Sequence, residues 1–214
     1  MKTRCPRPNP AKAAERISDF AVVARPIIRD VFPTDSCIAS SRIAIAALGA
    51  FGLRVQPIAA TVQVDNAILH RLLSANATPS AAEVTTWQAL GAYGVAIGQG
   101  IPAQCTDDDG WHGHLVAVAN GTWLIDASAD QMNRPKAGIE LPGVFVVPLP
   151  TPLPACPSAI QMDLPDGSHL VYGLHPSNRT FRTARDWELS ARAQAVVQTI
   201  IGAMLERHAL PLAG

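Results

Sequence analysis

The chain contains 214 residues, 48% of them hydrophobic, and its 17 acidic residues balance 17 lysines and arginines. This length and apolar content suffice for one domain with a buried core and exclude general disorder. Zero net charge without a basic run argues against a nucleic-acid partner. The sequence has no apolar run of about 18 residues, which argues against a membrane-spanning helix.

The N-terminal lead, residues 1–9, is polar and proline-rich, and we expect it to be loose. It lacks the apolar segment of a signal peptide. The four cysteines form no C-x-x-C pair, and such sparse cysteines fit a reducing compartment better than a disulfide framework. We therefore expect a cytoplasmic protein in which residues 10–214 form a single domain.

Two helices are expected in the first quarter of the chain. Apolar residues at helical spacing predict a helix over residues 10–31, which Pro26 would kink or split. A second helix is expected to begin at Cys37, because Thr34 and Asp35 are good N-capping residues and small apolar residues follow. Small side chains on this helix suit close packing against a sheet.

The middle of the chain alternates between strand and helix patterns. Ser80 and Glu83 form a capping-box pattern, which marks the start of one of these helices. The expected elements are, in order, a strand over 54–64, a helix over 67–75, a helix over 80–92, a short strand over 95–97 and a polar loop over 98–113.

Residues 114–126 predict a β-hairpin, because valines alternate, Asn120 and Gly121 form a turn, and an apolar run returns. The hairpin begins at His114 and ends at Asp126. The register of its two strands decides whether these two side chains share a face.

The sequence permits two registers. A two-residue turn pairs Ala119 with Thr122 and puts the imidazole and the carboxylate on opposite faces. A three-residue loop with a left-handed glycine pairs Val118 with Thr122 instead, and it puts His114 directly opposite Asp126.

The last third of the chain begins with a short buried strand over 144–147. Five prolines then predict a stiff, extended connector over 148–157, which we expect to cross the surface of the same domain. A hairpin over 160–172 and an amphipathic helix over 184–207 complete the predicted elements.

Three residues form a candidate catalytic triad: Cys37, His114 and Asp126. A thiol in the first turn of a helix feels the positive helix end, which favours the nucleophilic thiolate. A histidine can serve as general base, and a carboxylate can orient it. The competing interpretations are a buried core cysteine, a surface histidine and a turn aspartate.

This order of Cys at a helix start, His on a strand and Asp on the next strand resembles the papain-like cysteine superfamily, in particular its transglutaminase-like branch. The resemblance extends over residues 34–131 and includes the strand at 54–58 that follows the helix. The spacing from Asp126 through Ser128 to Gln131 is also similar to that of some bacterial transglutaminase-like chains. The resemblance implies a helix-borne cysteine packed on an antiparallel sheet that carries the histidine and the aspartate.

The sequence also departs from the pattern of that superfamily. Ser36 and Ile38 flank Cys37 in place of a Gln-x-Cys-Trp pattern, and no glutamine lies just upstream. The donors of an oxyanion hole are therefore unassigned. This departure motivates the alternative of a non-catalytic binding or structural protein that retains the fold.

A third hypothesis is a zinc hydrolase, because His112 and His114 form an H-x-H pair near Asp126 and the Asp107–Gly110 run. An H-x-H pair without a nearby cysteine pair or an H-E-x-x-H helix is a weak signal. We therefore expect no metal and no cofactor. Four further histidines have no recognisable partners in the sequence: His70, His169, His175 and His208.

The sequence thus predicts an α+β domain of papain/transglutaminase-like type. Its expected chemistry is thiol-dependent acyl transfer on an amide or ester, as in a cysteine peptidase, an amidase or a transglutaminase-like transferase. Cys37 would be the nucleophile, His114 would move the proton and Asp126 would orient the imidazole. The expected partner is a peptide, amide or ester substrate, with no nucleic acid and no membrane.

Overall fold

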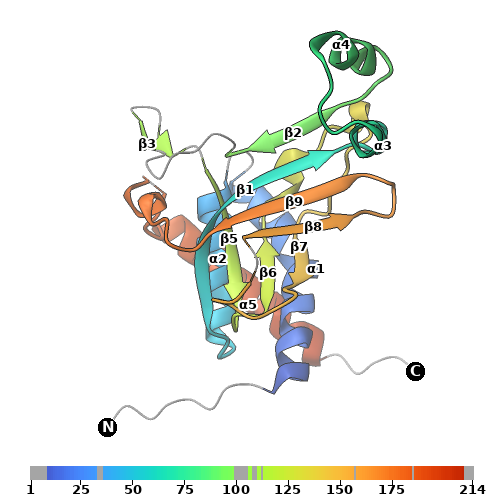
Figure 1. Ribbon diagram of the computed structural model, residues 1–214. Coiled ribbons are helices and arrows are strands. Elements are labelled where there is room, and N and C mark those ends of the chain that lie inside the picture. Colours follow the sequence, from blue (N-terminus) through green and yellow to red (C-terminus); the bar gives the residue numbers. More distant parts are fainter. Residues whose placement is uncertain are drawn as a thin grey trace, which may run out of the picture.

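The computed structural model describes residues 9–32, 36–98, 106–107, 110–111, 113–156, 158–184 and 186–209. Within these ranges the chain is a mixed α+β structure of five α-helices and a curled antiparallel sheet (Figure 1). None of the helices in the described ranges combines the length and the apolar character needed to cross a membrane.

The helices are α1 (Pro10–Val31), α2 (Cys37–Ala50), α3 (Ala67–Ala75), α4 (Ala81–Ala89) and α5 (Ala191–Ala209). The strands of the main sheet are β1 (Val55–Asp65), β2 (Gly94–Ile97), β5 (His114–Ala119), β6 (Trp123–Asp126), β7 (Phe145–Pro148), β8 (Ala159–Asp163) and β9 (His169–His175). A separate ribbon pairs β3 (Thr106–Asp107) with β4 (Gly110–Trp111), and short 3-10 turns are η1 (Ala129–Met132), η2 (Pro135–Ala137) and η3 (Thr180–Thr183).

The long strand β1 organises the main sheet, whose order is β7-β6-β5-β1-β9-β8 with β2 also paired to β1. The first half of β1 pairs with β5, its last four residues pair with β2, and β9 occupies the other edge. The segment after the proline-rich connector therefore contributes β9 to the centre of the same sheet as the candidate site.

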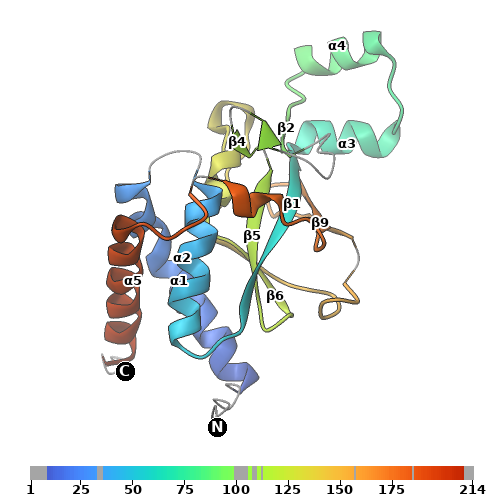
Figure 2. The same ribbon diagram turned by 90° about the vertical axis from the view of Figure 1, so that its left-hand side faces the viewer.

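Three helices, α1, α2 and α5, pack together on one face of the sheet (Figure 2). The buried side of α2 is built from small residues, among them Ala44 and Ala47, so this helix approaches the sheet closely as expected. The Ser41 hydroxyl donates a hydrogen bond of 2.7 Å to the carbonyl oxygen of Leu115 in β5. This bond fixes the start of α2 against the start of β5.

The expected kink or break at Pro26 does not split the first helix, which runs without interruption over Pro10–Val31. Pro26 is exposed, and so is Val22 one turn earlier, at 55%. The Val22 carbonyl, which loses its helical donor to the proline, can therefore bond to water.

The other face of the sheet carries a second apolar cluster. Val116 and Val118 from β5, Leu124 from β6 and Tyr172 from β9 are all fully buried there. Side chains alternate along a strand, so His114 shares this face with Val116 and Val118. The loop that includes η1 and η2 contributes further buried residues to the same cluster.

Helices α3 and α4 extend from the far end of β1 (Figure 2). The bounds of α3 match the prediction, and the predicted capping box at α4 is confirmed. The Ser80 hydroxyl accepts from the Glu83 amide at 3.3 Å, and a Glu83 carboxylate oxygen accepts from the Ser80 amide at 2.8 Å. Helix α4 ends at Ala89, three residues before the predicted end, in a turn that contains Gly91 at a φ of 87°.

The connector differs from the predicted stiff, extended segment. It bends repeatedly after β7, and Pro157 lies outside the described residues. The amides of Leu149 and Leu153 donate to the carbonyls of Thr122 and Gly121, each at 2.8 Å. These bonds fold the connector over the turn of the β5–β6 hairpin.

The last helix begins at Ala191, seven residues after the predicted start at position 184. The Ser190 hydroxyl accepts from the Ala193 amide at 3.2 Å, which caps the helix at this point. Trp187 precedes the helix and packs against Phe181 of η3, with ring centroids 5.0 Å apart. Tertiary packing of these aromatic rings thus replaces the expected first helical turns.

Candidate active site

Cys37 is the first residue of α2, as predicted, and its side chain is half-buried. Ser36 occupies the N-cap position but makes no side-chain capping hydrogen bond. The predicted capping residues, Thr34 and Asp35, lie outside the described residues. The thiol therefore lies at the positive end of a 14-residue helix.

The hairpin that carries the other two residues adopts neither predicted register. Ala119 pairs with Trp123 and Ala117 with Ile125, so the loop comprises Asn120, Gly121 and Thr122. Asn120 and Gly121 both have a positive φ, of 52° and 74°, which confirms the left-handed conformation predicted for the glycine.

This register places His114 and Asp126 on one face, although they are not directly opposite each other. Continued past the paired residues, it sets Asp126 against Val116, so His114 is the diagonal neighbour on the same face. The predicted direct pairing is therefore wrong, whereas the shared face is confirmed. Two left-handed residues start the turn and displace the pairing by two positions from the predicted bulged loop.

The His114 imidazole and the Asp126 carboxylate are both fully buried and lie 2.7 Å apart, Nε2 to Oδ2. The Tyr172 hydroxyl donates to the same carboxylate oxygen at 3.0 Å. The other oxygen accepts from the Ser128 amide at 3.0 Å and from its hydroxyl at 3.3 Å. Four donors thus satisfy this buried carboxylate, as an unpaired charge there would be costly.

The pair is electrostatically matched. Burial alone would lower the pKa of His114, but the charge and hydrogen bond of Asp126, with a smaller contribution from Cys37, raise it to about 10. Burial would raise the pKa of Asp126, but the His114 charge and hydrogen bond, helped by Ser128 and Tyr172, hold it below its ordinary value. At neutral pH the site therefore holds an imidazolium and a carboxylate.

The Cys37 side chain lies close enough to His114 to affect the pKa of this imidazole. Its Sγ is 3.8 Å from the carbonyl oxygen of Gly113, the residue before His114. Cys37 contributes to the raised pKa of His114. Within the described residues, the buried Nδ1 of His114 has no partner at hydrogen-bond distance and angle. Nδ1 is therefore the ring nitrogen available to the thiol, since Nε2 is bonded to Asp126.

Gln131 reaches the start of α2 from η1. With its amide oriented so that the oxygen faces the helix, Gln131 accepts from the Ser36 amide at 2.7 Å and from the Cys37 amide at 3.1 Å. The Asp126-x-Ser-x-x-Gln spacing was the sequence signal for this residue. A glutamine side chain thus lies at the start of α2, where its oxygen accepts hydrogen bonds from the backbone.

A buried ionic cluster supports the same helix end. Arg25 of α1 forms an ion pair with Asp130 at 2.6 Å, and the Arg25 side chain is 7% exposed. Its guanidinium also lies 3.5 Å from the hydroxyls of Ser36 and Ser40, which are 3.2 Å from each other. Asp130 is adjacent to Gln131, so the cluster fixes η1 against α1 and α2. Arg25 could not be identified from the sequence, because no local pattern connects it to Asp130.

Two aromatic side chains belong to the same apolar cluster as Cys37, and we call them the aromatic wall: Phe181 and Trp187. Cys37 and Ile38 pack with Phe181 and Trp187 in a small apolar cluster. The guanidinium of Arg42 lies 4.4 Å from the centre of the Trp187 ring, which holds the indole in place. The apolar spacing of the predicted last helix did not indicate that Trp187 would join the same cluster as Cys37.

The remaining histidine of the H-x-H pair, His112, and two of the four cysteines, Cys5 and Cys105, lie outside the described ranges. A surface cavity of about 870 Å³ is lined by residues at the far end of α2 and at the hairpin turn, including Gly49 and Gly121. It is therefore separate from the helix start that carries Cys37.

Comparison of the chain with protein-family models, with curated proteins and with solved structures found no match.

Proposed function

We propose that the protein catalyses thiol-dependent acyl transfer on an amide or ester, with Cys37, His114 and Asp126 as its catalytic triad. The observation that carries this proposal is the buried His114–Asp126 pair at 2.7 Å, whose second imidazole nitrogen is available beside a thiol at a helix start. In this arrangement Cys37 is the nucleophile, His114 carries the proton and Asp126 orients the imidazole, as this chemistry requires.

The raised pKa of His114, about 10, defines the role of each group. An imidazolium cannot accept a further proton, so Cys37 attacks the carbonyl carbon as a thiolate and forms a tetrahedral oxyanion. As the oxyanion collapses, the carbon–nitrogen or carbon–oxygen bond breaks and Nδ1 of His114 gives its proton to the leaving group. This leaves an acyl thioester on Cys37 and a neutral imidazole.

The second half of the reaction restores the resting state. The neutral imidazole of His114 takes a proton from water, or from an acceptor amine, which attacks the thioester. The carbon–sulfur bond breaks, the acid or the new amide leaves, and Cys37 is again a thiolate beside an imidazolium. Asp126 stays ionised and keeps the ring oriented through Nε2 in both halves.

Oxyanion stabilisation in this scheme involves Gln131. The amide of Cys37 at the positive helix end is a suitable donor to the oxyanion. In the resting structure the Gln131 oxygen accepts from this amide and from that of Ser36. Substrate binding therefore requires that the side chain of Gln131 turns away and releases one or both donors.

The aromatic wall favours an apolar group on the substrate. Trp187 and Phe181 belong to the same apolar cluster as Cys37 and Ile38. An apolar acyl or side-chain group would gain roughly 25 cal/mol for each Å² of apolar surface that it buries there. The proposed reaction is that of the transglutaminase-like branch of the papain-like superfamily, which the order of the three residues resembles.

An activated ester tests the proposal directly. We expect p-nitrophenyl acetate to release nitrophenolate in an initial burst and to leave an acetyl group on Cys37, located by peptide mass spectrometry. His114→Gln should slow acylation on the order of a hundredfold or more, since the proton-carrying partner is lost. The matched control is His175→Gln, because His175 is an exposed histidine on β9.

The acetylated peptide decides the outcome. An acetyl group found on Cys156 and not on Cys37, or an equal rate in His114→Gln and His175→Gln, contradicts the proposed triad. Either result would favour the alternative of a non-catalytic binding or structural protein.

A further inference from the structure

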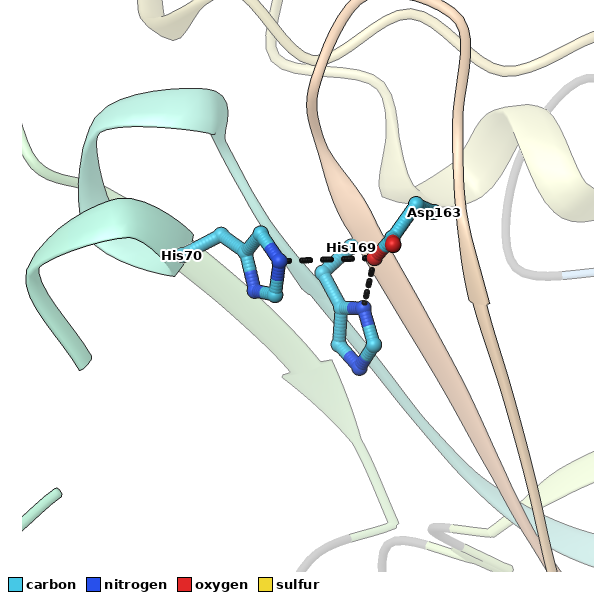
Figure 3. Close-up of side chains that lie close together, drawn as sticks. All are labelled: His70, Asp163 and His169. Carbon is cyan, nitrogen blue, oxygen red and sulfur yellow. Dashed lines mark hydrogen bonds and ion pairs between the residues drawn. The ribbon is translucent and has the colours of Figure 1, made fainter. Parts of the chain in front are cut away.

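A second cluster of ionisable side chains lies on other elements than the candidate triad. His70 of α3, Asp163 of β8 and His169 of β9 converge at one surface site (Figure 3). His169 Nδ1 is 2.7 Å from Asp163 Oδ1, and His70 Nε2 is 3.3 Å from the same oxygen. In the sequence neither histidine has a recognisable partner, so this grouping corrects that expectation.

Regular secondary structure positions all three side chains. Asp163 and His169 are directly paired across the β8–β9 hairpin, so their side chains share one face. His70 comes from α3, which follows β1 after Asn66. The Asn66 side chain caps α3 through the Leu69 amide at 2.9 Å, which sets where His70 lies.

The donor set fits a transition-metal ion. Zn²⁺ binds imidazole nitrogen and carboxylate oxygen at about 2.0–2.2 Å, so tetrahedral ligand atoms lie roughly 3.4 Å apart. The three ligand atoms here all lie within 4.8 Å of one another. Two imidazoles and one carboxylate also leave room for a water molecule as fourth ligand, since the Asp163 side chain is 73% exposed.

We propose that His70, Asp163 and His169 form a binding site for a divalent transition-metal ion of the Zn²⁺ type. The two imidazole rings stack with centroids 4.4 Å apart and 3° between their planes. A ring nitrogen binds a metal ion in the plane of its ring, so two stacked rings must rotate before both can bind one ion. The exposed Asp163 carboxylate is free to move with them. The nitrogen that binds the metal must carry no proton. In a neutral imidazole the proton is therefore on the other ring nitrogen.

Metal binding at this site would connect α3 to the β8–β9 hairpin. The existing contacts are a hydrogen bond from His169 and an ion-pair contact from His70, both to one oxygen of a largely exposed carboxylate, and they contribute little. A metal ion that binds only the folded chain adds RT ln(1 + [L]/Kd) to its stability. The site is independent of the proposed acyl transfer, because it shares no residue with Cys37, His114 or Asp126.

The test is titration of the full chain with ZnCl₂ alone, by isothermal calorimetry after chelator treatment and dialysis. The Cys37→Ala background is used, so that the thiol beside His114 cannot act as a competing zinc ligand. We expect one Zn²⁺ per chain, with affinity weakened by about tenfold or more in His70→Ala and in Asp163→Asn, since each loses one of three ligands. His175→Ala, an exposed histidine on the same strand β9, should bind as tightly as the parent.

NMR of the imidazole resonances provides a second measurement. It uses the parent protein, so it does not depend on the stability of the variants. Zn²⁺ should shift the ring resonances of His70 and His169 in the parent and leave those of His175 in place. Mg²⁺ should shift none of them, because it prefers oxygen ligands. Absence of zinc binding, or binding that His70→Ala and Asp163→Asn leave unchanged, would show a hydrogen-bonded cluster only and overturn the proposal.

Discussion

His114 Nε2 lies 2.7 Å from Asp126 Oδ2 in a position where neither side chain is exposed to solvent. The two residues are diagonal neighbours on adjacent antiparallel strands, so the backbone register holds the ring and the carboxylate together. Because the pair is buried, its charges are weakly screened and each partner strongly affects the protonation of the other. The reactivity of Cys37 and the stability of the fold should therefore both depend on this pair and on the groups around it.

Cys37 should be alkylated faster than Cys156 at about pH 6, well below the ordinary pKa of a free thiol, about 8.5. Cys37 is the nucleophile of the proposed triad and lies at the positive end of α2, close to His114. Burial raises the pKa of the Cys156 thiol, which disfavours its thiolate. Iodoacetamide labelling followed by peptide mass spectrometry measures both rates in one sample, and equal labelling of the two cysteines would contradict an activated thiol.

Tyr172→Phe should lower the free energy of unfolding by about 1–2 kcal/mol, since Asp126 loses one of its four donors in a buried site. Urea denaturation measures the change. The matched control is Tyr93→Phe, because the Tyr93 side chain is 43% exposed, and it should change stability by no more than about 0.5 kcal/mol. Equal effects of the two substitutions would argue against a structural role for the Tyr172 hydroxyl at Asp126.

The His114–Asp126 pair should make stability fall as the pH rises from about 6.5 to about 10. The folded-state pKa of His114, about 10, lies above the ordinary value of 6.5, so the folded chain holds this proton more tightly than the unfolded chain. Its stabilising contribution is complete below 6.5 and is lost as the pH rises through 10. Unfolding midpoints in urea across this range, compared with those of His114→Gln, isolate the contribution. A difference between the two proteins that does not change with pH would contradict the raised pKa.

Gln131→Ala should lower the free energy of unfolding by about 1–3 kcal/mol, because the amides of Ser36 and Cys37 lose their acceptor at a buried helix end. The control is Gln198→Ala, an exposed glutamine on α5, for which we expect a change of about 0.5 kcal/mol or less. Thermal and urea unfolding give the comparison. If both variants unfold alike, Gln131 does not cap α2.

The positions of most elements could be predicted because their signals are local. The capping box of Ser80 and Glu83 marks the start of α4 by bonds that span only three residues. Apolar periodicity similarly predicted α1, and alternating valines predicted the hairpin that carries His114 and Asp126. The start of α2 at Cys37 was also predicted, but its observed N-cap is Ser36, which makes no side-chain capping hydrogen bond.

The register of that hairpin depended on the turn. Asn120 and Gly121 both favour left-handed conformations, and the sequence alone allowed loops of different length. The connector packs on this turn through bonds from Leu149 and Leu153. The observed register therefore also involves contacts made by a segment that lies well beyond the hairpin along the chain.

By itself, the sequence determined where α1, α2 and α3 begin, which residues alternate on strands, and that a thiol lies at a helix start while an imidazole and a carboxylate lie on one hairpin. Tertiary structure decided that Gln131 reaches the start of α2, that Arg25 pairs with Asp130, and that His70 meets Asp163 and His169. The physical reason is that these contacts join segments distant along the chain. Their geometry follows from how the helices pack on the curled sheet, and no local period of apolar residues encodes it.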